Sequence, residues 1–458
     1  MQNEGSRSGA EGGAKIPLKG SVIPSDTQVA HELPSHASHP MDRMPIVLPL
    51  GARGLGAQRP DDASSYAGTQ VSHGITLQAA ITLALRHNPD MMIARSLVDS
   101  ARSEHRIARA LPNPTLFGNP NTPYQYGISI PLDVSPARVY RSRSTAVGVQ
   151  AVEADRADVG RQTTLAVARA FFDVLLTRER ERLATERRDQ VRRLLAADSL
   201  RVRTGDLPRQ NLARSEVEMA RSDADVARSE VDFQLARTSL RGLIGTPHDD
   251  TSFAVLGTLD YRRLDPPPDS LLAIAFSHRP DLVASAYRVT QSRVAERSAA
   301  ALNVPVPVLS FVRQYTAPFE SGHYYSLGLS FELPSVNLHG GERARAAAGA
   351  EIAAAVHQRV EVQLDRDVNA SLAQFRIQRT LVERFEAGLL SRVDASVEAA
   401  RYAYSRGATS LLDVLDAVRS QQDVRTDYYT ALHDYWVSAF ALNAAVGTDV
   451  FNLAGSSR

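Results

Sequence analysis

The chain has 458 residues, a formal net charge of +1 at pH 7 and no cysteine. This charge gives no reason to expect a nucleic-acid partner, and the missing cysteines exclude disulfide bonds, thiolate metal sites and an acylated N-terminal cysteine. No apolar stretch reaches the roughly 18 residues of a transmembrane helix, but strands of alternating polarity can still cross a membrane as a closed barrel.

The sequence contains two similar halves. Residues 84–90, ALRHNPD, return as residues 275–281, AFSHRPD, and further on Gly205 matches Gly407 and Gly245 matches Gly447. The spacing between matched positions grows slightly along the chain, which is typical of a duplicated unit with small insertions. We therefore predict one elongated unit with two-fold pseudo-symmetry.

The repeat divides the chain into five predicted parts. They are an N-terminal segment with little order (1–68), a first repeat (69–250), a linker (251–268), a second repeat (269–450) and a C-terminal tail (451–458). The first part is rich in Gly, Ser, His and Pro. Its residues 44–52, MPIVLPLGA, are the nearest candidate for an export signal, although Arg53 cuts the apolar run short.

Each repeat begins with a predicted amphipathic helix followed by a β-hairpin. In the first copy one apolar helix face combines five positions: Leu77, Ile81, Leu85, Met92 and Leu97. His87 and His278 stand beside Pro89 and Pro280 at matched places, which indicates a shared turn rather than a ligand role. The four predicted strands cover residues 115–119, 124–133, 305–315 and 323–333.

Apolar and small or polar residues alternate along these strands, which predicts a two-faced sheet. The apolar face carries Ile128, Ile130, Leu132, Tyr325, Leu327, Leu329 and Phe331. Because a bilayer admits no open sheet edge, four strands cannot span it alone, whereas three copies would give twelve strands in a closed barrel. We assign the apolar face to lipid.

Long helices follow each predicted hairpin. No proline occurs between Pro136 and Pro208, and none after Pro334, so the chain is free to run helical from about 142 to 203. Narrow seams at coiled-coil spacing predict close helix partners. The seams are Ala213, Val217, Ala220, Ala224, Ala227 and Val231, and Leu415, Val418, Gln422, Arg425, Tyr429, Leu432 and Trp436. Breaks at 204–208 and 406–409 turn each long helix back as a hairpin.

Over residues 74–448 this pattern resembles the TolC-like outer membrane efflux family. Leu111-Pro112-Asn113-Pro114 is similar to the branch associated with heavy-metal export. The resemblance implies a mainly α fold with a membrane β-barrel: a homotrimer whose 12-stranded β-barrel in outer membrane lipid continues as an α-helical barrel across the periplasm. It also implies a passive exit duct that works with a periplasmic adaptor and an inner-membrane pump.

Two segments resemble functional motifs of that family. Leu412-Asp413-Val414-Leu415-Asp416-Ala417 is similar to its aperture segment, so Asp413 and Asp416 of three chains would form a ring of carboxylates that favours cations. Gly205, Asp206, Arg406 and Gly407 resemble the tips contacted by the adaptor. Thr409 stands where the type member of the family has a basic residue, and Asn211 stands at an acidic position. The ionic latch that such residues form in the type member is therefore in doubt here. An exposed acidic helix face and helix-ending glycines are the simpler interpretations.

The sequence offers no catalytic or cofactor motif. His31 and His36 are spaced five apart around Pro34, which does not fit a helical zinc motif. We find no phosphate loop, serine elbow or Cys-His constellation, and therefore predict no enzyme, no cofactor and no bound metal. The alternative to a duct is a soluble, elongated coiled-coil scaffold, which would explain the heptads and the weak export signal but not the two-faced hairpins.

Overall fold

The structure is a computed structural model that describes residues 74–121, 124–245, 254–266, 270–316 and 322–453. The described residues are mainly helical with one small antiparallel sheet, as predicted. The predicted N-terminal segment, its candidate signal at 44–52 and its histidines lie outside the described residues, as do parts of the predicted linker and tail.

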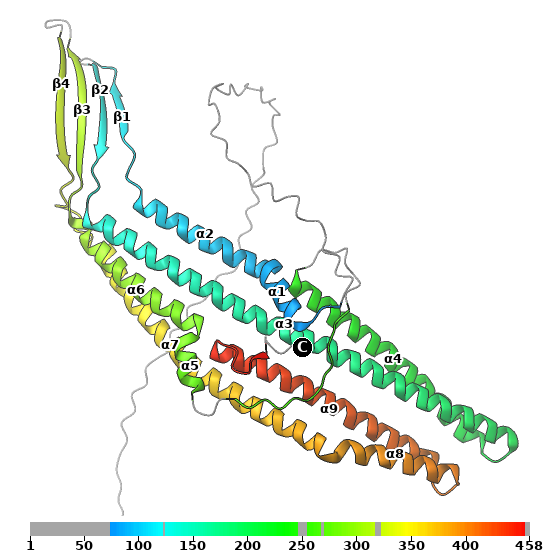
Figure 1. The fold of residues 1–458 in the computed structure, drawn as a ribbon. Coiled ribbons are helices and arrows are strands. Elements are labelled where there is room, and N and C mark those ends of the chain that lie inside the picture. Colours follow the sequence, from blue (N-terminus) through cyan, green and yellow to red (C-terminus); the bar gives the residue numbers. More distant parts are fainter. Residues whose placement is uncertain (1–73, 122–123, 246–253, 267–269, 317–321, 454–458) are drawn as a thin grey trace, which may run out of the picture. The chain divides into compact units, whose positions relative to one another are not determined.

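The same order of elements occurs twice along the chain (Figure 1). The first half contains α1 (Leu77–His87), α2 (Pro89–Arg109), β1 (Thr115–Asn119), β2 (Tyr124–Pro131), α3 (Pro136–Thr204) and α4 (Arg209–Ile244). The second half contains α5 (Leu271–His278), α6 (Pro280–Ala300), β3 (Pro307–Thr316), β4 (Gly322–Phe331), α7 (Gly340–Arg384), α8 (Leu390–Ser405) and α9 (Leu411–Val446).

The four strands form one sheet in the order β1-β2-β3-β4, with every neighbouring pair antiparallel. The register places Ile128 opposite both Leu116 and Phe311, and Phe311 opposite Leu327. Since side chains alternate between faces, these four residues share one face with the apolar positions predicted on the second and fourth strands. Phe117, Val308 and Val312 lie on the other face, which is therefore not purely small or polar. The four predicted strands are confirmed, with ends that differ by two residues or less.

The repeated His-Xaa-Pro-Asp motif forms a break between two helices in each half. α1 ends at His87 and α2 begins at Pro89, while α5 ends at His278 and α6 begins at Pro280. Proline suits a first helical turn because its missing N–H would have no partner there. The predicted shared turn is therefore confirmed.

This break corrects the predicted face of the first helix. Met92 and Leu97 are 56% exposed, whereas Met91, Ala94 and Val98 are buried. The periodicity of α1 does not continue into α2, because the extended backbone at Asn88 resets the phase of the helix. Only the α1 part of the predicted face, around Leu77 and Ile81, packs on the core.

Each break also contacts the end of the half's last helix. Asn88 Nδ2 donates to Leu243 O at 2.9 Å, and at the matched place Arg279 Nη1 donates to Ala445 O at 3.5 Å. The helices α4 and α9 end two residues later at left-handed glycines, Gly245 and Gly447. A Cβ on Gly245 would lie 2.5 Å from His87 O. The matched sequence motifs thus meet each other in space.

The long helices are confirmed, with one correction. α3 runs unbroken for 69 residues, and α4 returns antiparallel alongside its C-terminal part, as Figure 1 shows. In the second half a single π-helical turn, Phe385–Leu389, separates α7 from α8, and Gly388 has φ 105°. The absence of proline therefore permitted a long helix there but did not ensure one.

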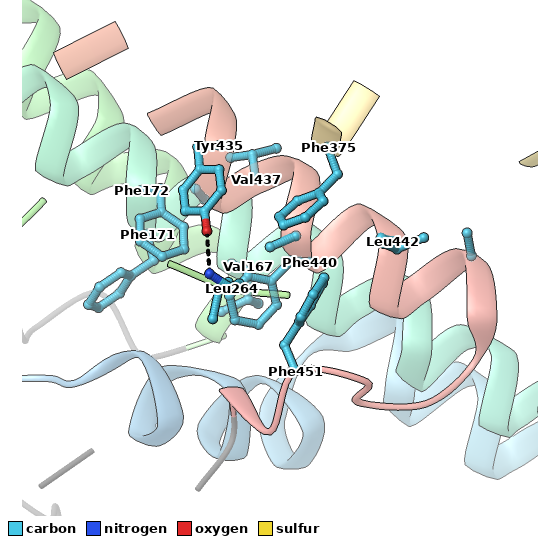
Figure 2. Close-up of a cluster of buried hydrophobic side chains, with 14 of the residues drawn as sticks. Val167, Phe171, Phe172, Leu264, Phe375, Tyr435, Val437, Phe440, Leu442 and Phe451 are labelled. Carbon is cyan, nitrogen blue, oxygen red and sulfur yellow. Dashed lines mark hydrogen bonds between the residues drawn. The ribbon is translucent and has the colours of Figure 1, made fainter. Parts of the chain in front are cut away.

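The main core lies where α1, α3, α7 and α9 meet the segment 254–266. Tyr435 is fully buried and donates its hydroxyl to Arg262 O, while it accepts from Leu264 N at 3.0 Å (Figure 2). Its ring lies 5.4 Å from that of Phe375, which lies 4.9 Å from Phe451. Trp436 stacks on Phe172 at 5.7 Å, so its predicted packing role is confirmed.

Within the described residues, no helix combines the length and the hydrophobicity needed to cross a bilayer.

Candidate functional site: the tips of the long hairpins

The tip of the first hairpin is a glycine turn. α3 ends at Gly205, whose φ of 85° lies in the left-handed region, and Asp206 N donates to Arg201 O at 2.8 Å. Thr204 Oγ1 donates to Asp206 Oδ2 at 2.6 Å, which holds the Asp206 side chain on the turn. A Cβ on Gly205 would meet nothing within 4 Å. The turn needs glycine for its backbone conformation and leaves open space around it.

The tip of the second hairpin repeats this geometry. Gly407 follows α8 with φ 73°, and a Cβ there would also meet nothing within 4 Å. The guanidinium of Arg406 lies 5.4 Å from the ring centre of Tyr402. The predicted breaks at 204–208 and 406–409 are therefore both confirmed as turns.

The two candidate constriction residues lie in the first turns of α9, and both are exposed. Asp413 Oδ2 accepts from Ser410 N at 2.9 Å and from Ser410 Oγ at 2.8 Å, which completes a capping box. Hydrogen bonds from the hydroxyls of Thr409 and Ser410 hold the pKa of Asp413 below its ordinary value. The Asp416 side chain is 61% exposed, and its Oδ1 lies 3.7 Å from Arg419 Nη1. Asp413 therefore has a structural role at the helix start, whereas the Asp416 carboxylate remains largely in solvent.

A buried carboxylate joins the two hairpins near their tips. Asp198 on α3 is fully buried and accepts from Tyr404 Oη on α8 at 2.7 Å and from Ser215 Oγ on α4 at 2.5 Å. Burial, followed by the hydrogen bond to Asp198, raises the pKa of Tyr404 to about 12. The hydroxyl therefore stays a donor at every physiological pH.

A second buried carboxylate, Glu218 on α4, also links the two hairpins. Glu218 accepts from Arg187 Nη2 on α3 at 2.6 Å and from Arg419 Nη2 on α9 at 2.7 Å. Burial opposes ionisation of Glu218, but the hydrogen bonds from Arg419 and Arg187 outweigh it and lower its pKa overall. Glu218 is thus an ionised acceptor shared by three helices.

A small apolar cluster of residues from α8 and α9 lies near the tips. Tyr404 and Val397 of α8 pack with Val414 and Val418 of α9, and Leu194 of α3 lies against them. This cluster is separate from the main core. The tips therefore have local packing in addition to their polar links.

The seam predicted on α4 does not face α3. α4 packs on α3 through another row, in which Ser215, Glu218 and Ser222 are buried. The predicted row is exposed in the single chain, with Val217 at 52% and Val231 at 57%. On α9 the seam is partly confirmed, because Leu415, Val418 and Leu432 are buried.

The strand residues assigned to lipid lie on one face of the sheet and are mostly exposed in the single chain. Tyr325, Leu327, Leu329 and Phe331 of β4 are 62%, 73%, 58% and 53% exposed. Ile128 and Ile130 of β2 are half-buried, and Leu132 just beyond β2 is 38% exposed. The exposed apolar row therefore follows β4 most strongly, at one edge of the sheet.

Sequence reasoning missed the residues that join the hairpins. Asp198, Glu218 and Arg419 look like ordinary charged residues on polar helices, and Tyr404 looks like an ordinary aromatic residue near a helix end. Their roles depend on contacts between helices far apart in sequence, which no local pattern records. No cluster of three His, Asp or Glu side chains suited to a metal ion is found in the described part of the chain.

The fold resembles that of solved outer membrane channels. Structures of CusC, described as forming a transmembrane channel, align with a TM-score of 0.70 at 18% identity, over 81% of this chain and 92% of that one. The CmeC outer membrane channel of Campylobacter jejuni aligns with a TM-score of 0.71 at 16% identity, over 81% and 86%.

One curated relative is similar in sequence as well. The cobalt-zinc-cadmium resistance protein CzcC of Cupriavidus metallidurans is 25% identical over 382 residues, which cover 81% of this chain and 90% of that protein. No protein-family model matches the chain. Together these comparisons confirm the predicted resemblance to outer membrane efflux proteins.

Proposed function

We propose that this protein is the outer-membrane exit duct of a tripartite efflux system, a passive channel made of three identical chains, each with two duplicated repeats. The observation that carries the proposal is the four-stranded sheet, in which one face combines the apolar row of β4 with apolar residues of the other three strands. β1 and β4 are its edges, and the apolar row of β4 is exposed in the single chain. Three such sheets joined edge to edge give a closed barrel of twelve strands.

The helices support the same assembly. α4 packs on α3 through one row and leaves the row from Ala213 to Val231 exposed. Rows of small residues at this spacing allow close approach of a neighbouring helix. In a trimer the neighbour would belong to the next chain, which completes the α-helical barrel.

The test is the mass of the protein extracted with detergent from a purified outer membrane, measured by native mass spectrometry. The expected result is a trimer that needs detergent to leave the membrane. A monomer or dimer found only in the soluble fraction would instead support the coiled-coil scaffold and exclude the duct.

Asp413 and Asp416 of three chains would form the constriction, with six carboxylates around a narrow pore. The low pKa of Asp413 keeps its carboxylate ionised, and acidic rings favour cations over anions. In single-channel recordings, Asp416→Asn should reduce the preference for cations without changing the fold, because the Asp416 side chain is largely exposed. Asp427→Asn, on an exposed position of α9, is the control. Unchanged selectivity in Asp416→Asn and in Asp413→Asn would remove the constriction assignment.

The proposed partners are a periplasmic adaptor at the hairpin tips and an inner-membrane pump behind it. Because the natural chain has no cysteine, single cysteines at Asp206 or Arg406 give unambiguous crosslinking sites. Both should crosslink to the periplasmic adaptor of its efflux system, whereas a cysteine at exposed Arg359 of α7 should not. Equal crosslinking at all three positions would show no tip contact.

Metal cations are the proposed cargo. The acidic constriction favours cations, and the sequence relative is a cobalt-zinc-cadmium resistance protein. Loss of this protein should therefore sensitise cells to divalent metal ions. Sensitivity to organic drugs with unchanged metal tolerance would assign a different cargo to the same duct.

A further inference from the structure

The apolar face of the sheet changes character toward its hairpin turns. Leu329 lies opposite Leu309, and Leu327 opposite Phe311, so the rows near the helices are apolar. The next rows toward the turns are aromatic and basic. These rows pair Tyr126 with Arg313 and Arg313 with Tyr325, and Tyr124 with Tyr315 and Tyr315 with His323.

Arg313 and His323 form one exposed cluster in these rows. Arg313 Nη2 donates to His323 Nδ1 at 3.3 Å, and the guanidinium lies 6.0 Å from the ring centre of Tyr325. The His323 ring is 5.2 Å from Tyr315. Because His323 accepts through Nδ1, the hydrogen of its neutral ring lies on Nε2. The cluster therefore offers several N–H donors, and within the described residues Arg313 has no carboxylate partner.

The position of Arg313 suits a lipid headgroup rather than the hydrocarbon. An arginine on a lipid-facing strand costs about 2–4 kcal/mol at the bilayer midplane but only about 0–1 kcal/mol near the interface. Arg313 lies about 10 Å from the end of β3, at roughly 3.4 Å per residue. Tyrosines surround it, as is typical of the interface girdle of a barrel. In the proposed duct the helices extend into the periplasm, so the hairpin turns face the outer leaflet.

We propose that Arg313 and His323 bind the phosphate monoester of an outer-leaflet lipid. The planar guanidinium matches phosphate oxygens with paired N–H donors, and His323 Nε2 adds a further donor. The lipid's acyl chains would lie along the apolar rows of Leu327 and Leu329. This inference rests on the proposed duct, because it needs the apolar face to contact a membrane.

The test is lipid retention by the detergent-solubilised full-length trimer in native mass spectrometry. Phosphatidic acid is compared with phosphatidylcholine of the same acyl chains, and inorganic phosphate is added as a competitor. Wild-type protein should retain phosphatidic acid about fivefold better than phosphatidylcholine, as expected for one cationic contact at the surface. Arg313→Gln should remove this preference. The double variant Arg313→Gln with Gln314→Arg keeps the net charge but moves the guanidinium to the other face of the sheet, and it should also lose the preference.

Each result decides one point. Equal retention of the two lipids by the wild-type trimer overturns the inference, and this measurement does not depend on how any variant folds. A preference that persists in the double variant indicates general charge attraction and also overturns it. Displacement of phosphatidic acid by millimolar inorganic phosphate assigns the cluster to free anions instead. If the protein is not extracted from the membrane as a trimer, the proposed duct is excluded, and the inference is excluded with it.

Discussion

The two long hairpins of this chain share a plan but differ in continuity. In the first, α3 runs for 69 residues before the turn at Gly205. In the second, the corresponding helix is interrupted at Phe385–Leu389, where Gly388 has φ 105° and Ala387 has ψ 17°. Beyond this joint α8 is therefore not continuous with α7, whereas α9 runs unbroken from Leu411 to Val446. The difference shows that a duplicated plan can place a rigid element and a jointed one side by side.

Polar links compensate for the joint. Tyr404 of α8 donates to Asp198, and Arg419 of α9 donates to Glu218, and both acceptors belong to the first hairpin. Beyond the joint, α8 and the start of α9 thus make polar contacts with side chains of the first hairpin. Breaking these links should loosen the second hairpin and leave the first unchanged.

The largest effect is expected for Glu218→Gln. This variant weakens the charged hydrogen bonds from Arg187 and Arg419, each a charge-assisted contact, and should lower the free energy of unfolding by about 2 kcal/mol. Denaturant unfolding of the solubilised protein measures the change. Glu216→Gln, an exposed position two residues earlier on α4, should change it by less than about 0.5 kcal/mol. Equal effects of the two variants would show that the buried link is not stabilising.

The same link should weaken in acid. The pKa of Glu218 is lower in the folded protein than its ordinary value of 4.5, so its contribution is present above that value and is lost as the pH falls through the folded pKa. The stability difference between wild type and Glu218→Gln should therefore shrink below about pH 4.5. A difference that stays constant from pH 7 to pH 3 would contradict an ionised Glu218.

The joint itself is tested by Gly388→Ala. A Cβ at Gly388 would meet nothing closer than Ser391 Oγ at 3.8 Å, so only the left-handed backbone disfavours alanine, by about 1–2 kcal/mol. Gly349→Ala is a control whose effect on stability should have the opposite sign. Gly349 lies in the regular helix α7, where alanine should stabilise by about 0.5–1 kcal/mol. If both variants raise the unfolding temperature, the joint is helical in solution and the comparison of the hairpins fails.

Local signals in the sequence predicted the elements well. Alternation gave the strands, glycines gave the turns, and the His-Xaa-Pro-Asp repeats gave the matched helix breaks. The joint at Gly388 was missed because glycine is also compatible with a helix, and only the observed φ distinguishes the two states. The α4 seam predicted a close helix partner, but in the single chain this row is exposed and α4 packs on α3 through another row. A helix with two usable rows does not reveal which row faces its own hairpin partner.

The candidate site was predicted less completely. The tip glycines and the acidic pair came from a resemblance, and their roles in the duct remain predictions. Asp198 and Glu218 were not found, because a carboxylate on a polar helix looks the same in the sequence whether it faces solvent or two other helices. Only the contacts with Tyr404 and Arg419 identify them.

A smaller effect is expected for Tyr404→Phe. The variant removes one of the two hydroxyl donors to the buried carboxylate of Asp198 and should cost about 1 kcal/mol. Hydrogen exchange should accelerate in α8 but not in α3, since the joint isolates α8. Tyr402→Phe is the control, because Tyr402 is 65% exposed. Uniform acceleration along both hairpins would mean that the link stabilises the whole bundle rather than the jointed part.

The smallest and most similar effects are expected at the two tips. Gly205→Ala and Gly407→Ala should each cost about 1 kcal/mol, since both glycines have positive φ and open space for a Cβ. Stability alone therefore does not distinguish the tips. The affinity for the adaptor distinguishes them if the tips are its docking site. A methyl group in the open space beside the glycine would then contact the adaptor. A loss of binding far larger than the loss of stability in either variant would assign the open space around that glycine to the adaptor. Equal small losses in both measurements would leave the glycines with only their conformational role.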